Sequence, residues 1–467
     1  MSEQASLPPA TMPLPIVPRP AAPRRFGLDA AVSVTILLRG FTSFSGLATL
    51  WLIALTLDRG EQGYYYTFGS LLAVQVFAEL GINFVVMQFA SHEMVELSYA
   101  ADGTLQGNAR ALGRLSALLR FALLWFATLS ALFVAVVIPA GVWFLSRDRS
   151  ATAPHWHVAW ILSVVFTALL LLVAPFMSLL EGCGRVAQMA QARLLQAVAG
   201  SVILWLAFLA HAGLLALPLS LAATALGGIG WLWWHERAVL RSLLGTRPTD
   251  GPRALLRELL PMQWRIALSW LSGYFVSQLF TPVLFSTRGA VEAGQMGMSV
   301  SLAGGVSAVA LVWITTKSPM FGTFVAQRAL PRLDDLFERS LRQAMIVGIA
   351  VAAGLGLVLA LGTHLRPALA SRLISPGAMV ALVLASLASV ILTAEAVYLR
   401  AFKREPFLPV SLAVGGATSA STLLLAPRYG AAGVAIGYCV VNWIIGVGIG
   451  TWLFRRLRTK ARVEFAT

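Results

Sequence analysis

Long apolar runs, each ended by Gly, Pro or a charged residue, recur along the whole chain and limit what it can fold into. A run of about 20 apolar residues matches the hydrocarbon core of a bilayer, where helices and closed barrels satisfy their backbone polar groups. The sequence therefore predicts an all-α polytopic membrane protein with twelve transmembrane helices. We place these spans at 28–57, 62–91, 115–145, 156–180, 187–211, 214–235, 262–286, 291–316, 341–363, 377–399, 406–426 and 430–454.

Charged residues are scarce and lie mainly between the apolar runs. Of the 467 residues, 12% are charged and 58% are hydrophobic, whereas a soluble domain carries about 25% charged residues. The net charge of +15 would favour nucleic-acid binding in a soluble chain, but the position of the charge favours a membrane and no nucleic acid. Two cysteines, Cys183 and Cys439, supply neither a disulfide framework nor a four-ligand metal site.

The basic residues fall unequally on the two sides of the predicted spans. Cytoplasmic loops of membrane proteins retain Lys and Arg. With the amino terminus inside, 27 of the 35 basic residues lie in cytoplasmic segments and seven lie outside, while Arg39 falls inside the first span. The sequence therefore predicts that both termini are cytoplasmic.

The two halves of the chain resemble each other. Arg59-Gly60 followed by Gly63-Tyr64-Tyr65-Tyr66 is matched in the second half by Arg288-Gly289 followed by Gly294-Gln295-Met296-Gly297. Halves of six spans keep the same orientation, so the repeats are parallel and enclose a central cleft. The predicted domains are a disordered Pro-rich tail, an N-lobe, a cytoplasmic linker, a C-lobe and a basic cytoplasmic tail, over residues 1–25, 26–235, 236–261, 262–454 and 455–467.

Several motifs now suggest a family. The stretch Glu61-Gln62-Gly63-Tyr64-Tyr65-Tyr66, leading into Glu79-Leu80-Gly81-Ile82, resembles the second span of bacterial polysaccharide flippases. Ala293-Gly294-Gln295-Met296-Gly297 resembles the entry to their eighth span. Ser318-Pro319-Met320-Phe321 and Leu336-Phe337-Glu338-Arg339 resemble the exit from that span and the linker after it. Over about residues 27 to 455 the chain resembles the O-antigen flippase branch of the multidrug, oligosaccharidyl-lipid and polysaccharide exporter superfamily.

This resemblance implies two pseudo-symmetric six-helix bundles in a bacterial inner membrane. It implies a transporter that flips an undecaprenyl-pyrophosphate-linked oligosaccharide by alternating access, for polysaccharide and lipopolysaccharide biosynthesis. The expected partners are the lipid-linked oligosaccharide, the membrane and glycan-assembly proteins. We expect no cofactor and no enzymatic activity, because the sequence contains neither a phosphate-binding loop nor a nucleophile constellation.

Arg39 is the sharpest local signal, because it lies about 16 Å into the first span, near mid-bilayer. A charge at that depth normally faces a cavity or a partner. Its helix face is shared by Thr35, Thr42, Gly46 and Thr49. We expect this face to line the cleft, with Arg39, Thr35 and Thr42 binding a phosphate or an acidic sugar. In the alternative, Arg39 forms a structural pair with Glu79 or another acid.

A second polar stripe falls in the second span, where Gln75, Glu79 and Asn83 follow at four-residue spacing. Glu79 is a candidate for binding a coupling proton or cation. A buried acid near a basic group is also typical of a packing ion pair. The sequence leaves both roles open.

Other functions compete with the flippase. A multidrug cation antiporter of the same superfamily would present acids in its cleft, and Glu79 keeps that alternative open, whereas Arg39 favours an anionic substrate. A lipid II flippase typically has fourteen spans, two more than we find. A membrane-embedded polymerase or ligase, which would be an enzyme, needs a large extracytoplasmic loop, and the longest outer loop here has about ten residues.

Overall fold

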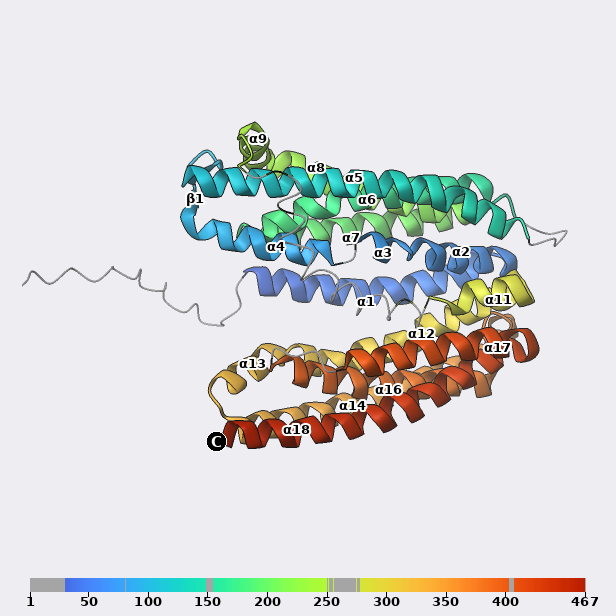
Figure 1. The fold of residues 1–467 in the computed structure, drawn as a ribbon. Helices are drawn as coiled ribbons and strands as arrows, with labels where there is room; N and C mark the ends of the chain where they lie inside the picture. The colour runs from blue at the N-terminus through green and yellow to red at the C-terminus, as the bar shows by residue number, and fades with distance from the viewer. Residues whose placement is uncertain are drawn as a thin grey trace, which may run out of the picture.

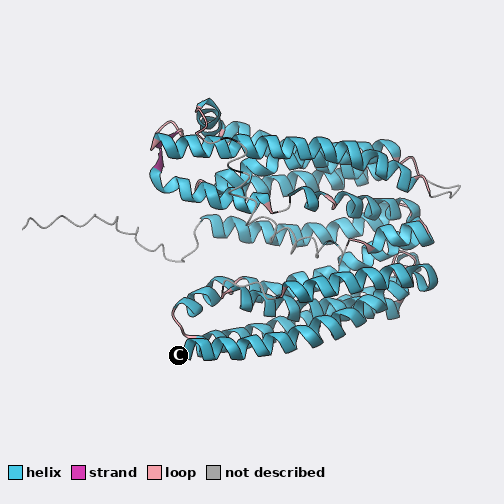
Figure 2. Cartoon of the chain, in the orientation of Figure 1, coloured by secondary structure: helices cyan, strands magenta, loops and turns pink. Residues whose placement is uncertain are grey.

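The computed structural model describes residues 30–79, 81–147, 154–249, 251, 255, 274, 278–402 and 407–466. Within these ranges nearly all regular structure is helical (Figure 2). Nine described helices are long and apolar enough to cross a membrane, or ten when one bent pair is counted as a span. The predicted Pro-rich tail at 1–25 and most of the predicted span at 262–286 lie outside the described residues.

The helices of the first half pack on one another and form the upper group in Figure 1. Their order is α1 (Ala30–Thr56), α2 (Arg59–Leu72), α3 (Gln75–Glu79), α4 (Ile82–Glu93), η1 (Met94–Glu96), β1 (Leu97–Tyr99), β2 (Leu105–Gly107), α5 (Ala109–Leu145), α6 (His157–Gly182), α7 (Val186–Leu209), η2 (Gly213–Leu215), α8 (Ala216–His235) and α9 (Arg237–Gly245).

The second half forms the lower group in Figure 1, and α2 is the helix of the first half that packs most closely on it, against α11 and α12. Its elements are α11 (Phe280–Arg288), α12 (Ala290–Thr315), α13 (Ser318–Ala326), α14 (Leu330–Leu365), α15 (Pro367–Ala370), α16 (Pro376–Arg400), α17 (Leu408–Val441), the π-helix η3 (Asn442–Ile449) and α18 (Gly450–Ala466).

The helices run roughly parallel, so the molecule has two ends (Figure 1). We call the end where α1 begins and α18 finishes the near end. The far end is the opposite one, where α1 finishes and α2 begins. Arg372 and Gln62 are in contact at the far end. Arg185 and Glu236 are in contact at the near end, just after the C-terminal ends of α6 and α8.

A small β-hairpin interrupts the otherwise helical first half. β1 and β2 pair in antiparallel register, with Ser98 opposite Gln106. The turn between them is closed by Asp102, whose Oδ1 accepts a hydrogen bond from the Thr104 backbone amide at 2.9 Å. Gly103 follows with φ of +84°, a conformation that favours glycine. Asp-Gly is a recognised turn signal, but a hairpin of three-residue strands is too short to show a period-2 pattern.

The second predicted span, 62–91, is broken rather than continuous. Its helical pieces α2, α3 and α4 are separated after Leu72 and again around Gly81, and the segments before and after Gly81 are bent by 44°. Gly81 has φ of +76°, which a right-handed helix cannot contain. This break places Asn83 in a different helix from Gln75 and Glu79.

Gly430 divides α17 into two helical stretches. Its φ is +58°, and the backbone amide of Ala431 donates a 2.6 Å hydrogen bond to Glu292 Oε1 on α12. The Glu292 side chain therefore satisfies an amide at the start of the new helical stretch, where a helix has no internal acceptor. The kink falls between the predicted spans 406–426 and 430–454, so it supports their separation.

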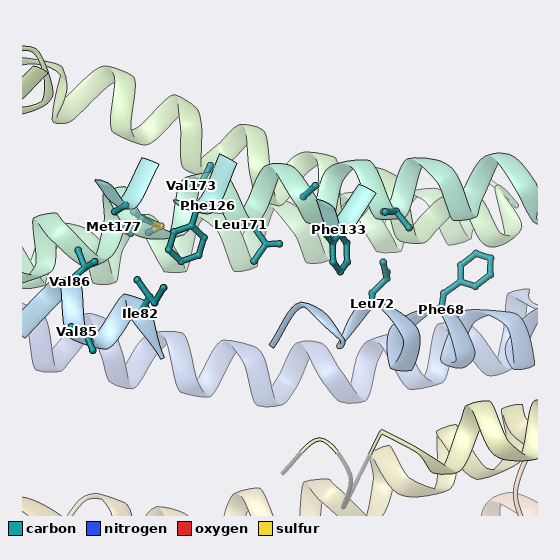
Figure 3. Close-up of a cluster of buried hydrophobic side chains, with 14 of the residues drawn as sticks. Phe68, Leu72, Ile82, Val85, Val86, Phe126, Phe133, Leu171, Val173 and Met177 are labelled. Atoms are coloured by element: carbon teal, nitrogen blue, oxygen red, sulfur yellow. The ribbon is translucent and has the colours of Figure 1, made fainter. Parts of the chain in front are cut away.

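Apolar side chains fill the interior of the first half. Figure 3 shows Phe68, Leu72, Ile82 and Val86 pointing from α2 and α4 toward Phe126, Phe133, Leu171, Val173 and Met177 of α5 and α6. Pro139 and Pro175 lie within α5 and α6. The packing of this interior holds α2 against the rest of the first half.

Two predicted polar segments contain ordered helices. The predicted linker at 236–261 begins with α9, which packs Val239 and Leu243 against its neighbours. The predicted basic tail at 455–467 continues α18 to Ala466. In α18, Arg458 donates from Nε to Asp334 Oδ1 at 2.8 Å and from Nη2 to Glu338 Oε1 at 2.7 Å. These bonds attach α18 to the start of α14.

Candidate functional site

Arg39 reaches from the first half to the second. Its Nη1 donates a hydrogen bond to Thr315 Oγ1 near the end of α12, at 3.4 Å and across 276 positions of sequence. The Arg39 side chain is exposed. Among the described residues it forms no ion pair, with Glu79 or with any other acid. A guanidinium with one long hydrogen bond keeps most of its donors free for another anion.

Open space adjoins the same faces of the two helices. Gly46 follows Arg39 by seven residues on α1, two helical turns along the same face. Gly304 precedes Thr315 by eleven residues, three turns along α12. A methyl group added at Gly46 or at Gly304, or at the neighbouring Gly305, would meet no atom within 4 Å. Each of these glycines is exposed and lies next to open space on its own helix.

At the far end α1 and α12 come together again. Ile53 and Leu57 of α1 belong to an apolar cluster that includes Met298, with Leu302 packed against it. The exposed stretches of α1 and α12 that carry Gly46 and Gly304 thus lie between two contacts, this cluster and the Arg39–Thr315 hydrogen bond. We call this region the interhelical cleft. It is the candidate functional site.

Of the threonines predicted to share the Arg39 face, two are exposed and one packs against another helix. Thr35 and Thr42 are exposed, in agreement with a position on an open face. Thr42 Oγ1 donates to the backbone carbonyl of Arg39 at 3.0 Å, an interaction within α1. Thr49 faces α7 instead of the cleft, because its hydroxyl accepts a 2.9 Å hydrogen bond from Trp205 Nε1.

The predicted coupling residues lie at the break between α3 and α4. The Asn83 side chain lies near Glu79, while Asn83 Oδ1 is buried with no hydrogen-bond partner. Gln75 and Glu79 are half-buried on α3. The structure thus brings Glu79 and Asn83 together across the break, and it does not bring Glu79 into contact with Arg39.

A buried charge pair at the near end lies outside the cleft. Glu236, between α8 and α9, is 1% exposed, and its Oε2 is 3.7 Å from Arg185 Nε. Burial raises the pKa of Glu236, and the nearby Arg185 partly offsets that rise. The Arg185 guanidinium also lies over the Tyr99 ring, 4.2 Å from its centroid. This pair joins the hairpin, the α6–α7 turn and the α8–α9 junction.

Two residues at the boundary between the halves were missed by the sequence analysis. Thr315 stands in the polar run Thr315-Thr316-Lys317, which could have indicated a polar surface at the end of the eighth span. Gln62 was used only as part of a motif, although an amide inside an apolar run requires hydrogen-bond partners. It is 1% exposed and bonds across the boundary to Gly294 and Arg372.

The chain matches no family model and no curated protein by sequence. Its structure is similar to an inward-facing multidrug-resistance MATE-family transporter of the MOP superfamily, with a TM-score of 0.64, 15% identity and coverage of 93% of this chain and 98% of that one. An outward-facing MATE-family transporter is similar with a TM-score of 0.60 and 15% identity, over 93% of this chain and 96% of that one. The lipid II flippase MurJ in an inward closed conformation is similar with a TM-score of 0.60 and 14% identity, over 92% of this chain and 91% of that one.

These similarities extend over nearly all of both chains, so they show that the protein has the fold of MOP-superfamily transporters. At 14–15% identity they show the fold alone. The superfamily suggested by the sequence motifs agrees with this fold. The neighbours include both a multidrug transporter and a lipid flippase, so the fold does not select a substrate.

Proposed function

We propose that the protein is a flippase for an anionic lipid-linked oligosaccharide, and that the interhelical cleft holds the charged headgroup. Arg39 carries this proposal, because it is an exposed cation at the boundary between the halves with no acidic partner among the described residues. Cationic donors suit a diphosphate such as that of an undecaprenyl-pyrophosphate-linked repeat unit. Thr35 and Thr42 add hydroxyl groups on the same exposed face.

Alternating access explains why the cleft lies between halves that meet mainly at one end. In this proposal the halves rock about the bound headgroup and expose the cleft to each side of the membrane in turn. The excess of basic residues at the near end supports placing that end, with both termini, in the cytoplasm of a bacterial inner membrane.

A binding experiment tests the substrate class. Purified protein is mixed with a polyprenyl pyrophosphate, with the corresponding polyprenol, or with a lipophilic cation, and binding is followed by fluorescence. We expect the pyrophosphate to bind more tightly than the polyprenol, and Arg39→Ala to remove that difference. Equal binding of the pyrophosphate and the polyprenol would contradict an anion site.

The second candidate is a multidrug cation antiporter. Glu79 favours it, because this half-buried acid lies near the Asn83 amide and has no cationic partner among the described residues. In that case the lipophilic cation binds, Glu79→Gln weakens its binding, and Arg39→Ala does not. The same three ligands therefore separate the two functions.

A further inference from the structure

Two glycines bring the backbones of the halves into contact at the far end. A Cβ atom built on Gly63 of α2 would overlap the backbone carbonyl of Ala290, and one built on Gly294 of α12 would lie 2.7 Å from the Gly63 amide nitrogen. Both glycines are buried. Since neither position has room for the smallest side chain, the α2–α12 crossing depends on glycine in both helices.

Gln62, next to this crossing, directs its amide into the second half. Its Nε2 donates to the backbone carbonyls of Gly294 at 2.9 Å and Arg372 at 3.1 Å. Its Oε1 accepts a hydrogen bond from Arg372 Nη1 at 3.3 Å. One buried side chain of α2 therefore bonds to both α12 and the loop that precedes α16.

The contact continues along α2 for two further turns. A Cβ on Gly297 of α12 would overlap the ring of Tyr66, and Ser70 Oγ donates to Thr281 Oγ1 of α11 at 3.2 Å. On the other side of the cleft, the hydrogen bond described between the halves is the 3.4 Å bond from Arg39 to Thr315. The far end is thus the more tightly closed side of the cleft.

We propose that α2 and α12 form the far-end gate of the transport path, with Gln62 as the residue that holds the gate closed. This inference rests on the proposed transport by alternating access, but not on the identity of the substrate. A headgroup leaves the cleft at the far end only when α2 separates from α12. Separation breaks the Gln62 hydrogen bonds and exposes the Gly63–Gly294 contact to water.

Gly46 offers a reporter position, because a side chain there enters open space. In a background with Cys183 and Cys439 replaced by Ala, Gly46→Cys is labelled with a membrane-impermeant maleimide from the far-end side, using intact cells and inside-out vesicles. The gate proposal predicts slow labelling in this parent. Gln62→Leu should raise the rate by roughly tenfold, as expected from the loss of about 1.4 kcal/mol of net hydrogen bonding.

Gly63→Ala should raise labelling in the same direction, because the added methyl group forces the helices apart. Gly69→Ala is the matched control: Gly69 is in the same helix, and a methyl group there meets no atom within 4 Å. Its labelling should equal the parent's. Unchanged labelling in folded Gln62→Leu and Gly63→Ala proteins, or an equal rise in Gly69→Ala, would overturn the gate.

A cross-linking experiment does not depend on the folding of weakened variants. Gln62 Nε2 lies 3.8 Å from Met298 Sδ of α12, so cysteines at these two positions can be joined by a short thiol cross-linker. Joining them should abolish transport, and a reducible linker should restore it on reduction. Transport by the fully cross-linked protein would place the gate elsewhere. Failure of polyprenyl-pyrophosphate binding with a normal gate response would instead overturn only the substrate.

Discussion

Arg39 on α1 and Thr315 on α12 join the two halves of the chain by a single 3.4 Å hydrogen bond beside open space. A contact of that length between an exposed cation and a hydroxyl contributes little to stability, about 1 kcal/mol or less. The pair therefore offers a way to separate two roles of Arg39. One role is to bind an anion, and the other is to hold α1 near α12.

Substitutions at the two partners should differ if Arg39 binds substrate. Arg39→Ala is expected to abolish glycan export at normal protein abundance, and Arg39→Lys to restore part of it, since Lys keeps the charge but not the bidentate geometry. Thr315→Val, which removes only the contact between the halves, should keep most of the export. The measurement is export per folded molecule. Equal losses in Arg39→Ala and Thr315→Val would identify a structural contact instead.

Glu79 distinguishes the flippase from the antiporter. Glu79→Gln retains the size and polarity of the side chain beside Asn83 while removing the exchangeable charge. In a cation antiporter this change should eliminate proton-driven cation efflux from proteoliposomes. In a flippase that does not use Glu79 for coupling, glycan export should stay within about twofold of wild type, an effect below 0.5 kcal/mol on the barrier. Gln75→Glu, which adds an acid on the same short helix, is the control for local charge.

Glu236 should make stability depend on pH. Its pKa is raised above the ordinary 4.5 by burial, so the folded protein binds a proton more readily than the unfolded chain does. The resulting destabilisation is absent below about pH 4.5 and grows as pH rises through the raised pKa. Glu236→Gln should therefore increase the thermal midpoint above that window and leave it unchanged below. A midpoint lowered above about pH 4.5 and unchanged below it would show instead that the pair with Arg185 outweighs burial.

Arg458 should be needed for the stability of the second half. Its side chain is 17% exposed and binds Asp334, which is 9% exposed and also accepts a 2.7 Å hydrogen bond from the Tyr398 hydroxyl. Arg458→Gln removes the cation that binds the buried Asp334 carboxylate at 2.8 Å, and breaking a buried ion pair costs about 3 kcal/mol or more. The thermal midpoint in detergent should fall clearly. Arg456→Gln, at an exposed position two residues earlier, is the control and should have little effect.

Orientation in the membrane follows from labelling of single cysteines. Arg247→Cys, Arg332→Cys and Lys460→Cys should react from the cytoplasmic side, and Arg366→Cys from the outside. Cys183 should give little background, because burial raises the pKa of its thiol to about 12. Reaction of the Arg247 variant from outside would contradict the proposed orientation of both halves.

Most of the helical architecture could be predicted from the sequence, because long apolar runs carry a strong signal in a membrane protein. The ends of α1 and α6 lie within a few residues of the predicted limits. The breaks were harder to predict. Gly81 and Gly430 both adopt positive φ. The chain contains 40 glycines, and the sequence alone does not tell which of them break a helix, because that depends on the packing around each one.

The site was predictable in part. Arg39 stood out because charge is costly at mid-bilayer, whereas its partner Thr315 could not be predicted, since the two residues are 276 positions apart and no local pattern relates them. Thr49 was predicted to face the cleft, but it faces Trp205 of α7. It lies at the edge of the helical stripe, and periodicity alone does not show where one packing surface ends and the next begins.

The glycines at the α2–α12 crossing occupy matching places in the two repeated halves, and each is already the smallest residue available. If either glycine is replaced by a larger residue, the opposite glycine cannot become smaller to make room for it. If the halves arose by duplication, they have not been free to diverge independently at this point. The same constraint applies to protein engineering: a half exchanged with that of a relative will dock here only when both partners bring glycine to the crossing.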